Sequence, residues 1–393
     1  MTGMLIYIPW PTNTGYAMHR AETQFLAVAR RLVQDPQRIF FAYRSLEGGH
    51  PRSLPEAFRN IVACDFEGGQ SQKLGNIERV IREHEIDLML GYDLGVSNPR
   101  YSRLRRAGIS TVISYWGAPM SPANSGLVLL AKRLQVLCTR SRPDHFVFQS
   151  RAMQRLAVQG RGIPSNETSV IRTGVNIGAL PGREARRGYA HVALGVPTDR
   201  QLVIFSGHVN ARKGIGTLIE AMNELVFRRG RRDVQVVLLG GVDPAEAALF
   251  ERVRLLNLTD YFMFAGYRDD VFDIFSSANI GVLPTTGWDS FPRSGLEMQG
   301  CGLPLVVAHR QGLPEMIKEG VTGFTVKPGD PIDLADRIEL LMNDATLQRE
   351  MGNRAADRVR EQFTDERFVD ELAALIAQVA CGRARLGQPD VTR

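Results

Sequence analysis

Apolar and polar positions alternate in blocks along the whole chain. Short runs of β-branched and aromatic residues are separated by longer stretches with helical periodicity, such as His19–Val33 and Gly214–Arg228. The runs predict strands and the stretches predict helices, an alternation typical of parallel sheets covered by helices on both faces. The predicted strands are Leu5–Trp10, Ile39–Tyr43, Ile61–Cys64, Leu88–Tyr92, Thr111–Trp116, His145–Phe148, Ser169–Arg172, Leu202–Ser206, Val234–Leu239, Tyr261–Phe264, Ile280–Leu283, Leu305–Ala308 and Gly323–Val326.

The strand–helix pattern restarts near residue 201, after a polar and irregular stretch. That stretch, Gly174–Arg200, contains PGREARRG and GVPTDR, and we expect it to be an interdomain linker. The fold class predicted is therefore α/β, with two doubly wound, Rossmann-like domains facing each other across a cleft. Open α/β sheets bind ligands beyond the carboxyl ends of their strands, so a ligand-binding or catalytic protein is favoured over a scaffold.

Composition agrees with a globular protein of two domains. The 393 residues are 44% hydrophobic and 23% charged, which excludes a disordered or fibrous chain. No stretch approaches the ~20 continuous apolar residues that cross a bilayer. No charged region precedes the first apolar run, so we expect no signal peptide and a cytoplasmic location.

The net charge of +6 is unevenly distributed. Residues 1–172 carry 22 Lys and Arg against 13 Asp and Glu, whereas the remaining residues carry 26 against 29. A basic N-terminal half suits anionic ligands or an anionic lipid surface, and a solvated arginine-rich face is the alternative. The segment LLAKRLQVLCTRSRP could lie on such a membrane or pack its leucines into the core. Nucleic acid is not expected, because no recognised binding motif accompanies the charge.

Cysteine and histidine give no metal-site signal. The four cysteines and seven histidines are scattered, without C-x-x-C pairs or ligand spacing. We expect buried or idle thiols, and no metal or other cofactor.

Two loops that follow predicted strands carry candidate anion-binding groups. Gly15 lies in the turn PTNTG before a helix, where a glycine lets backbone N–H groups approach an anion; an ordinary tight turn is the alternative. Arg212 and Lys213 follow the strand that ends at Ser206, in SGHVNARKGIGTLIEA. They could neutralise a diphosphate or form a solvated basic turn.

A third loop, in LPTTGWDSFPRSGLEMQGCGLPLVV, is the most informative. Ser290 near the cap and Pro292 at the first turn predict a helix N-terminus that faces the cleft. Asp289 precedes this helix and Glu297 lies inside it. Two carboxylates beside an anion-binding helix end suit the hydroxyls of a sugar and a ribose. The alternative is that a carboxylate here only interacts with the helix dipole, which explains Asp289 better than Glu297.

Residues 206–330 resemble the donor-binding domain of the family 4 retaining glycosyltransferases of the GT-B fold (glycosyl transferases group 1). One matching motif would be weak, but five follow in the family's order, and the N-terminal half matches more loosely. The motifs are RTGVN, which precedes that range at residues 172–176, and then SGHVNARKGIGTLIEA, FAGYRDDVFDIFSSANIGVLPT, WDSFPRSGLEMQGCGLPLVV (the E-x7-E segment) and GLPEMIKEGVTGFTVKPGDPIDLADRI.

The resemblance implies three regions and a set of site residues. Residues 1–176 would bind the acceptor, residues 177–365 the nucleotide-sugar donor, and residues 366–393 would form a helix returning toward the N-terminal domain plus a frayed tail. Lys213 would contact the diphosphate, Asp289 the sugar hydroxyls and Glu297 the ribose, and these three are the expected catalytic residues. The full expected donor set is Gly15, His208, Arg212, Lys213, Tyr267, Asp289, Ser290, Phe291, Pro292, Arg293, Ser294 and Glu297; the expected acceptor set is Tyr16, Tyr115 and Trp116.

The chain departs from the family pattern in several places. His208 stands where the family usually has an arginine, and Asp289 where it has a glutamate. Trp116 stands where a histidine is common, and TG replaces paired glycines before the first helix. Tyr115 and Trp116 could stack on a sugar or ring acceptor, or be core aromatics.

The implied reaction moves a hexosyl-type sugar from a nucleotide diphosphate sugar, with UDP favoured, to a hydroxyl of a small molecule or glycan. The family is thought to use same-face attack with retention and without a metal. The alternatives are a GT-B relative with other chemistry, such as an epimerase or phosphorylase, and a non-catalytic nucleotide-sugar-binding protein.

Overall fold

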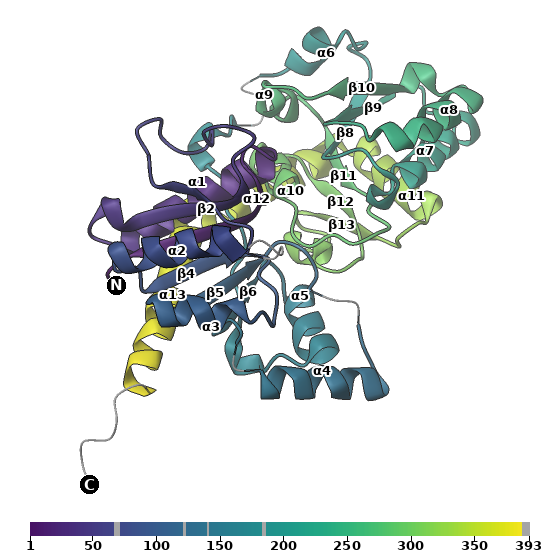
Figure 1. Cartoon of the computed structure of the whole chain (residues 1–393). Coiled ribbons are helices and arrows are strands. Elements are labelled where there is room, and N and C mark those ends of the chain that lie inside the picture. The colour runs from purple at the N-terminus through teal and green to yellow at the C-terminus, as the bar shows by residue number, and fades with distance from the viewer. Residues whose placement is uncertain (67–70, 121–122, 140, 183–185, 387–393) are drawn as a thin grey trace. The chain divides into compact units, whose positions relative to one another are not determined.

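The computed structural model describes residues 1–66, 71–120, 123–139, 141–182 and 186–386, and the chain forms two compact units (Figure 1). The N-terminal unit contains Met1–Arg172 together with the residues from Glu366 onward. The C-terminal unit is Thr173–Asp365, whereas we expected it to begin at residue 177.

Seven parallel strands form one sheet in the described part of the N-terminal unit, in the order β3-β2-β1-β4-β5-β6-β7. The strands are β1 (Met4–Pro11), β2 (Ile39–Ser45), β3 (Ile61–Ala63), β4 (Leu88–Tyr92), β5 (Thr111–Trp116), β6 (His145–Phe148) and β7 (Thr168–Val170). The helices are α1 (Tyr16–Leu32), α2 (Ser71–Glu83), α3 (Arg100–Ala107), α4 (Gly126–Cys138), α5 (Arg151–Arg155), which continues as a π-helix to Arg161, and α13 (Asp365–Leu386).

Alternating side chains of the strands build a core on each face of this sheet. Ile6 of β1 packs in one core with Phe25 of α1 and Leu372 of α13. Its neighbour Tyr7 points to the other face, where it packs in a core with Ile81 of α2. Helix α13 therefore completes the core of the N-terminal unit, although the whole C-terminal unit separates it from α5 in the sequence.

Six parallel strands form the sheet in the described part of the C-terminal unit, in the order β10-β9-β8-β11-β12-β13. The strands are β8 (Gln201–Ser206), β9 (Val234–Leu239), β10 (Phe262–Gly266), β11 (Ile280–Leu283), β12 (Leu305–Ala308) and β13 (Gly323–Val326). The helices are α6 (Tyr189–Leu194), α7 (Ile215–Asn223), α8 (Ala247–Leu255), α9 (Val271–Ser276), α10 (Arg293–Gly300), α11 (Pro331–Asn343) and α12 (Ala345–Gln362).

Both sheets have the same kind of strand order. The direction of winding reverses between β1 and β4 in one unit and between β8 and β11 in the other. The predicted α/β class with two doubly wound, Rossmann-like units is confirmed. Open sheets of this type bind ligands at the carboxyl edge of such a reversal, so we expect ligand-binding residues in the loops after these four strands.

The stretch Gly174–Arg200 is not the linker that its polar composition predicted. It belongs to the C-terminal unit and contains α6. Tyr189 Oη donates a hydrogen bond to Asp270 Oδ2 at 2.8 Å, and the backbone N–H of Ala190 donates to Ser277 Oγ at 2.9 Å. These bonds and the burial of Ala190 attach the segment to α9, which its arginines and glycines did not indicate.

Candidate functional site at the edge between β8 and β11

The loops after β8 and β11 are in close contact. Strands β8 and β11 are parallel neighbours, so their carboxyl ends lie side by side. The N–H groups of Thr286 and Gly287 donate to Arg212 O at 3.0 and 2.8 Å. Gly214 has φ +75°, and a Cβ there would lie 1.9 Å from Pro284 O. Glycine permits both this backbone conformation and this approach, so Gly214 allows the two loops to lie in contact.

Lys213 and Asp289 form an ion pair where these loops meet. Lys213 Nζ lies 2.5 Å from Asp289 Oδ2, and the two side chains are only 12% and 8% exposed. Thr285 Oγ1 lies 3.2 Å from the same carboxylate oxygen, and the N–H of Asp289 donates to Gln311 Oε1 at 2.7 Å. Lys213 and Thr285 thus hold the carboxylate, Gln311 holds the backbone of the same residue, and Lys213 neutralises the charge.

A second cation lies beside this pair. The guanidinium of Arg212 lies over the ring of Trp288, 4.2 Å from its centroid, and Arg212 Nη1 donates to Trp288 O at 2.9 Å. Trp288 is half-exposed, so Arg212 is held against an aromatic face rather than by a carboxylate. His208, in the same loop, is exposed.

Tyr267 supplies an exposed aromatic ring at the same edge of the sheet. It follows β10 and is 79% exposed. A Cβ at Gly241, which follows β9, would lie 2.8 Å from Tyr267 Cε2, so the ring lies over that glycine. The loops after β8, β9, β10 and β11 therefore all contribute predicted donor residues or their supports to the carboxyl edge.

Helix α10 begins beside Asp289. Pro292 is its N-cap residue and no side chain caps the helix, so Ser290 does not have the capping role that we expected. Glu297 lies in the second turn and is only 5% exposed. The start of this helix presents backbone N–H groups and a partial positive charge next to Asp289.

Arg293 and Phe291 have supporting contacts in the C-terminal unit. Arg293 Nη2 donates to Thr173 Oγ1 at 2.7 Å, and its Nη1 contacts Gly174 O and Asp365. The buried ring of Phe291 packs edge-on against Phe363. These side chains join the start of α10 to both ends of the C-terminal unit, while the backbone of 291–294 remains the part expected to bind the donor.

Gly15 and Tyr16 belong to the N-terminal unit. Gly15 follows β1, has φ +142° and precedes the first turn of α1, and its carbonyl accepts from the N–H groups of Met18 and His19 at 3.1 Å. No atom lies within 4 Å of the position a Cβ would take, and Tyr16 is 51% exposed. Both residues thus lie at the carboxyl edge where the N-terminal sheet reverses.

Tyr115 and Trp116 take the core alternative rather than the acceptor one. The Tyr115 ring is buried and its centroid lies 5.4 Å from that of Phe25 and 5.7 Å from that of Phe368. Trp116 packs in a core with Phe146. Its buried Nε1–H has no hydrogen-bond partner among the described residues. Strand alternation alone could not separate buried from exposed aromatics at the end of a strand.

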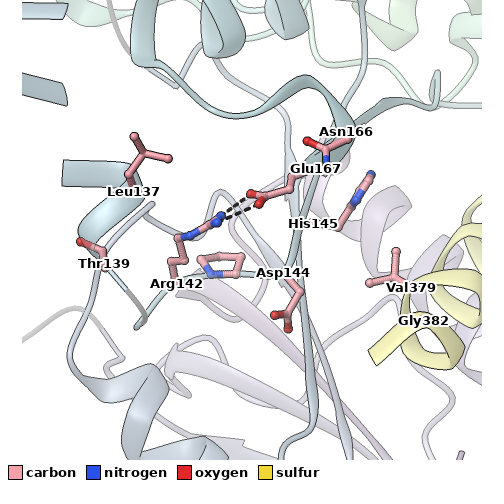
Figure 2. A pocket seen from close by; sticks show the side chains of 10 residues that line it. Leu137, Thr139, Arg142, Asp144, His145, Asn166, Glu167, Val379 and Gly382 are labelled. Atoms are coloured by element: carbon pink, nitrogen blue, oxygen red, sulfur yellow. Dashed lines mark hydrogen bonds and ion pairs between the residues drawn. The ribbon is translucent and has the colours of Figure 1, made fainter. Parts of the chain in front are cut away.

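A cavity of about 640 Å³ in the N-terminal unit lies at the opposite edge of its sheet (Figure 2). Asp144, His145 and Glu167 surround the amino ends of β6 and β7. Arg142 Nη2 lies 2.8 Å from Glu167 Oε1, and Asp144 is paired with Arg105 at 2.8 Å. Burial lowers the pKa of His145. Because the Glu167 and Asp144 carboxylates are already paired with arginines, we do not include this cavity in the candidate site.

Among the described residues, no group of three or more His, Cys, Asp and Glu side chains is arranged to hold a metal ion. In the same part of the chain, no helix is both long and apolar enough to cross a membrane.

Residues 189–358 match the profile of the glycosyl transferases group 1. Among the relatives, D-inositol 3-phosphate glycosyltransferase of Corynebacterium diphtheriae is 28% identical over 221 residues, covering 55% of this chain and 51% of the relative. N-acetyl-alpha-D-glucosaminyl L-malate synthase of Bacillus anthracis is 27% identical over 185 residues, 47% of each chain. The chain thus spans about half the length of the curated relatives it matches.

The likeness in structure extends much further than the likeness in sequence. HepE of Anabaena, solved in complex with UDP, superposes with a TM-score of 0.77 over 96% of this chain and 100% of its own, at 18% identity. That similarity concerns the fold of both units. Residues 189–358 are thus similar to the glycosyl transferases group 1, and the chain has the GT-B fold.

Proposed function

We propose that this protein transfers a sugar from a nucleotide diphosphate sugar to a hydroxyl group, with retention at the anomeric carbon. The observation that carries the proposal is the pairing of Lys213 with Asp289 at the reversal between β8 and β11, where open α/β sheets bind their ligands. The names of the relatives support glycosyl transfer, and the UDP bound by HepE favours a UDP-sugar such as a UDP-hexose.

Donor binding would rearrange the ion pair. The diphosphate would take Lys213 as its counter-ion, and the Asp289 carboxylate would then accept hydrogen bonds from sugar hydroxyls. Glu297 would accept hydrogen bonds from the ribose, and the exposed face of Tyr267 would pack against the base. His208 would add positive charge to this site only when protonated.

The chain's own groups would stabilise the leaving diphosphate. In same-face attack the acceptor oxygen bonds to the anomeric carbon while the bond from that carbon to the phosphate oxygen breaks, and the acceptor proton passes to the leaving phosphate. Lys213, Arg212 and the start of α10 would stabilise the charge that develops on this phosphate. With these cations in place we expect turnover to persist in a metal chelator.

The N-terminal unit, with Gly15 and Tyr16 at its carboxyl edge, would bind the acceptor, a small molecule or a glycan. The cytoplasmic location expected from the sequence stays a prediction. Contact with a membrane is a separate proposal, because different residues carry it.

The test is incubation of the purified protein with a panel of nucleotide sugars, followed by detection of released nucleotide diphosphate by mass spectrometry. Slow hydrolysis of one donor is expected, and Glu297→Gln should lower it by about 100-fold. Glu220→Gln is the control, because Glu220 lies on the surface of α7 and pairs with Arg252. The proposal would be contradicted if no nucleotide sugar is hydrolysed and none raises the melting temperature. Thermal stabilisation without turnover under any acceptor would indicate a binding protein.

A further inference from the structure

Helix α4 presents an apolar face that no other described residue covers. Leu127, Leu130, Leu134 and Leu137 are 83%, 53%, 52% and 71% exposed. Their spacing of three, four and three residues places them on one side of the helix. Figure 1 shows α4 along an edge of the N-terminal unit, beside α5. Four leucines exposed on one side of a helix form a contiguous apolar surface, which marks an interaction site.

The opposite side of α4 is firmly attached. Val136 is buried in a core with Phe146. Arg161 Nη1 donates to Lys132 O at 3.2 Å, and its Nη2 donates to Gln135 Oε1 at 3.0 Å. The leucines therefore point outward from a fixed helix, which excludes the core packing that the sequence left open for them.

Unpaired positive charge lies on α4 itself and on the neighbouring α5. Between Asp93 and Asp144 the sequence contains eight Lys and Arg residues and no Asp or Glu, and three of these cations are paired with Glu78, Asp144 and Glu167. Within the described residues Lys132, Arg133 and Arg155 form no ion pair. Arg133 is an exposed residue of α4, about a quarter of a turn around the helix from the leucines. Arg155 is exposed on α5. A partner of this face must therefore be apolar and carry negative charge.

We propose that α4 docks the N-terminal unit on an anionic phospholipid surface. The leucines would enter the boundary between headgroups and acyl chains, and the surrounding cations would contact headgroup phosphates. A helix of this length spans about 20 Å, so it lies in the surface rather than crossing the ~30 Å hydrocarbon core. A second copy of the chain is disfavoured because it would bring two unpaired basic surfaces together. The proposal does not depend on glycosyl transfer.

The test is co-sedimentation of the full-length protein with vesicles of phosphatidylcholine, alone or mixed with phosphatidylglycerol. Binding to the mixed vesicles is expected, and it should weaken as salt is raised. Leu130→Gln/Leu134→Gln should lower it at least about tenfold, and Arg133→Gln/Arg155→Gln should lower it without altering the leucines. Val192→Gln/Leu255→Gln is the matched control, because both residues are exposed in the C-terminal unit.

Three results would overturn the proposal. They are equal binding to neutral and anionic vesicles, full binding by the leucine variant, and a dimer of the unaltered protein that the leucine variant dissociates while neither protein binds vesicles. Circular dichroism and gel filtration establish that each variant is folded, and analytical ultracentrifugation gives the oligomeric state.

Discussion

Lys213 Nζ lies 2.5 Å from Asp289 Oδ2, although 76 residues separate the two in the sequence. The residue expected to bind a diphosphate and the residue expected to bind a sugar thus neutralise each other. Under the proposed function, an anionic donor would compete with Asp289 for Lys213. Donor binding and release of the carboxylate would then be one event.

The ion pair should show strong coupling in stability. Lys213→Met leaves the Asp289 carboxylate nearly buried and unpaired, so we expect a loss of about 3 kcal/mol in the free energy of unfolding. Lys213→Met/Asp289→Asn removes both charges and should recover much of that loss. Urea unfolding of the two single variants and the double variant measures the coupling. Additive losses would show that the two side chains do not interact in solution.

Gly214 should not tolerate a side chain. Gly214→Ala places a Cβ 1.9 Å from Pro284 O in a backbone with φ +75°, and we expect it to cost at least about 2 kcal/mol. Gly216→Ala is the matched control, because no atom lies within 4 Å of its Cβ position in α7. In a helix that change should stabilise by about 0.5–1 kcal/mol. Thermal unfolding of the two variants compares them directly, and equal stability would refute the close approach of the loops.

Glu22 should make stability depend on pH. It is buried in α1, and burial raises the pKa of its carboxyl even though Ser53 donates a hydrogen bond to it. The folded state therefore holds this proton more tightly than the unfolded state. Stability is expected to be full below the ordinary pKa of a glutamate and to fall as pH rises through the raised pKa. Glu22→Gln should remove this fall, which unfolding curves between pH 4 and 9 would reveal.

Ser53→Ala gives an independent check of the same group. The Ser53 hydroxyl favours the ionised form of Glu22, so its loss should raise the pKa further and move the fall in stability to higher pH. A pH dependence unchanged in both variants would show that Glu22 is not the group responsible.

Tyr189 should anchor α6. Its hydroxyl donates to Asp270. The pKa of the Asp270 carboxyl is lowered to about 2, mainly by a hydrogen bond from the guanidinium of Arg268. Tyr189→Phe removes the bond from Tyr189, and we expect local opening of α6 to become easier by about 1 kcal/mol. Hydrogen exchange of residues 189–194 measures the effect. Tyr261→Phe is the control, because the Tyr261 hydroxyl accepts from Arg232 away from α6. Equal exchange rates of α6 in the two variants would show that Tyr189 does not anchor this helix.

Strands that are continuous apolar runs were the easiest elements to predict. Leu88–Tyr92, Thr111–Trp116 and Val234–Leu239 have the bounds that the sequence indicated, because strands buried on both faces admit few polar residues. Two helices were missed. Half of the eight residues of α3 are arginines, which mask its short apolar face of Tyr101, Leu104 and Ala107, and α6 buries only Ala190.

The candidate site was only partly predictable. Helix signals placed Asp289 before α10 and Glu297 within it, since these relationships are local. The pairing of Lys213 with Asp289 depends on β8 lying beside β11, which no local pattern specifies. Trp288 and Gln311 were not expected. An aromatic residue directly before a candidate carboxylate was the available signal for Trp288, and Gln311 had none.

The return of α13 to the N-terminal unit sets an order of completion during synthesis. Residues 173–365 are contiguous, so all of the C-terminal unit has been made before α13 leaves the ribosome. Phe368, Leu372 and Ile376 fill the core beneath β1, so the N-terminal unit stays unfinished until they arrive. Of the two units, the one whose synthesis begins earlier is thus completed later, and the nascent chain exposes that open core throughout translation of the other unit.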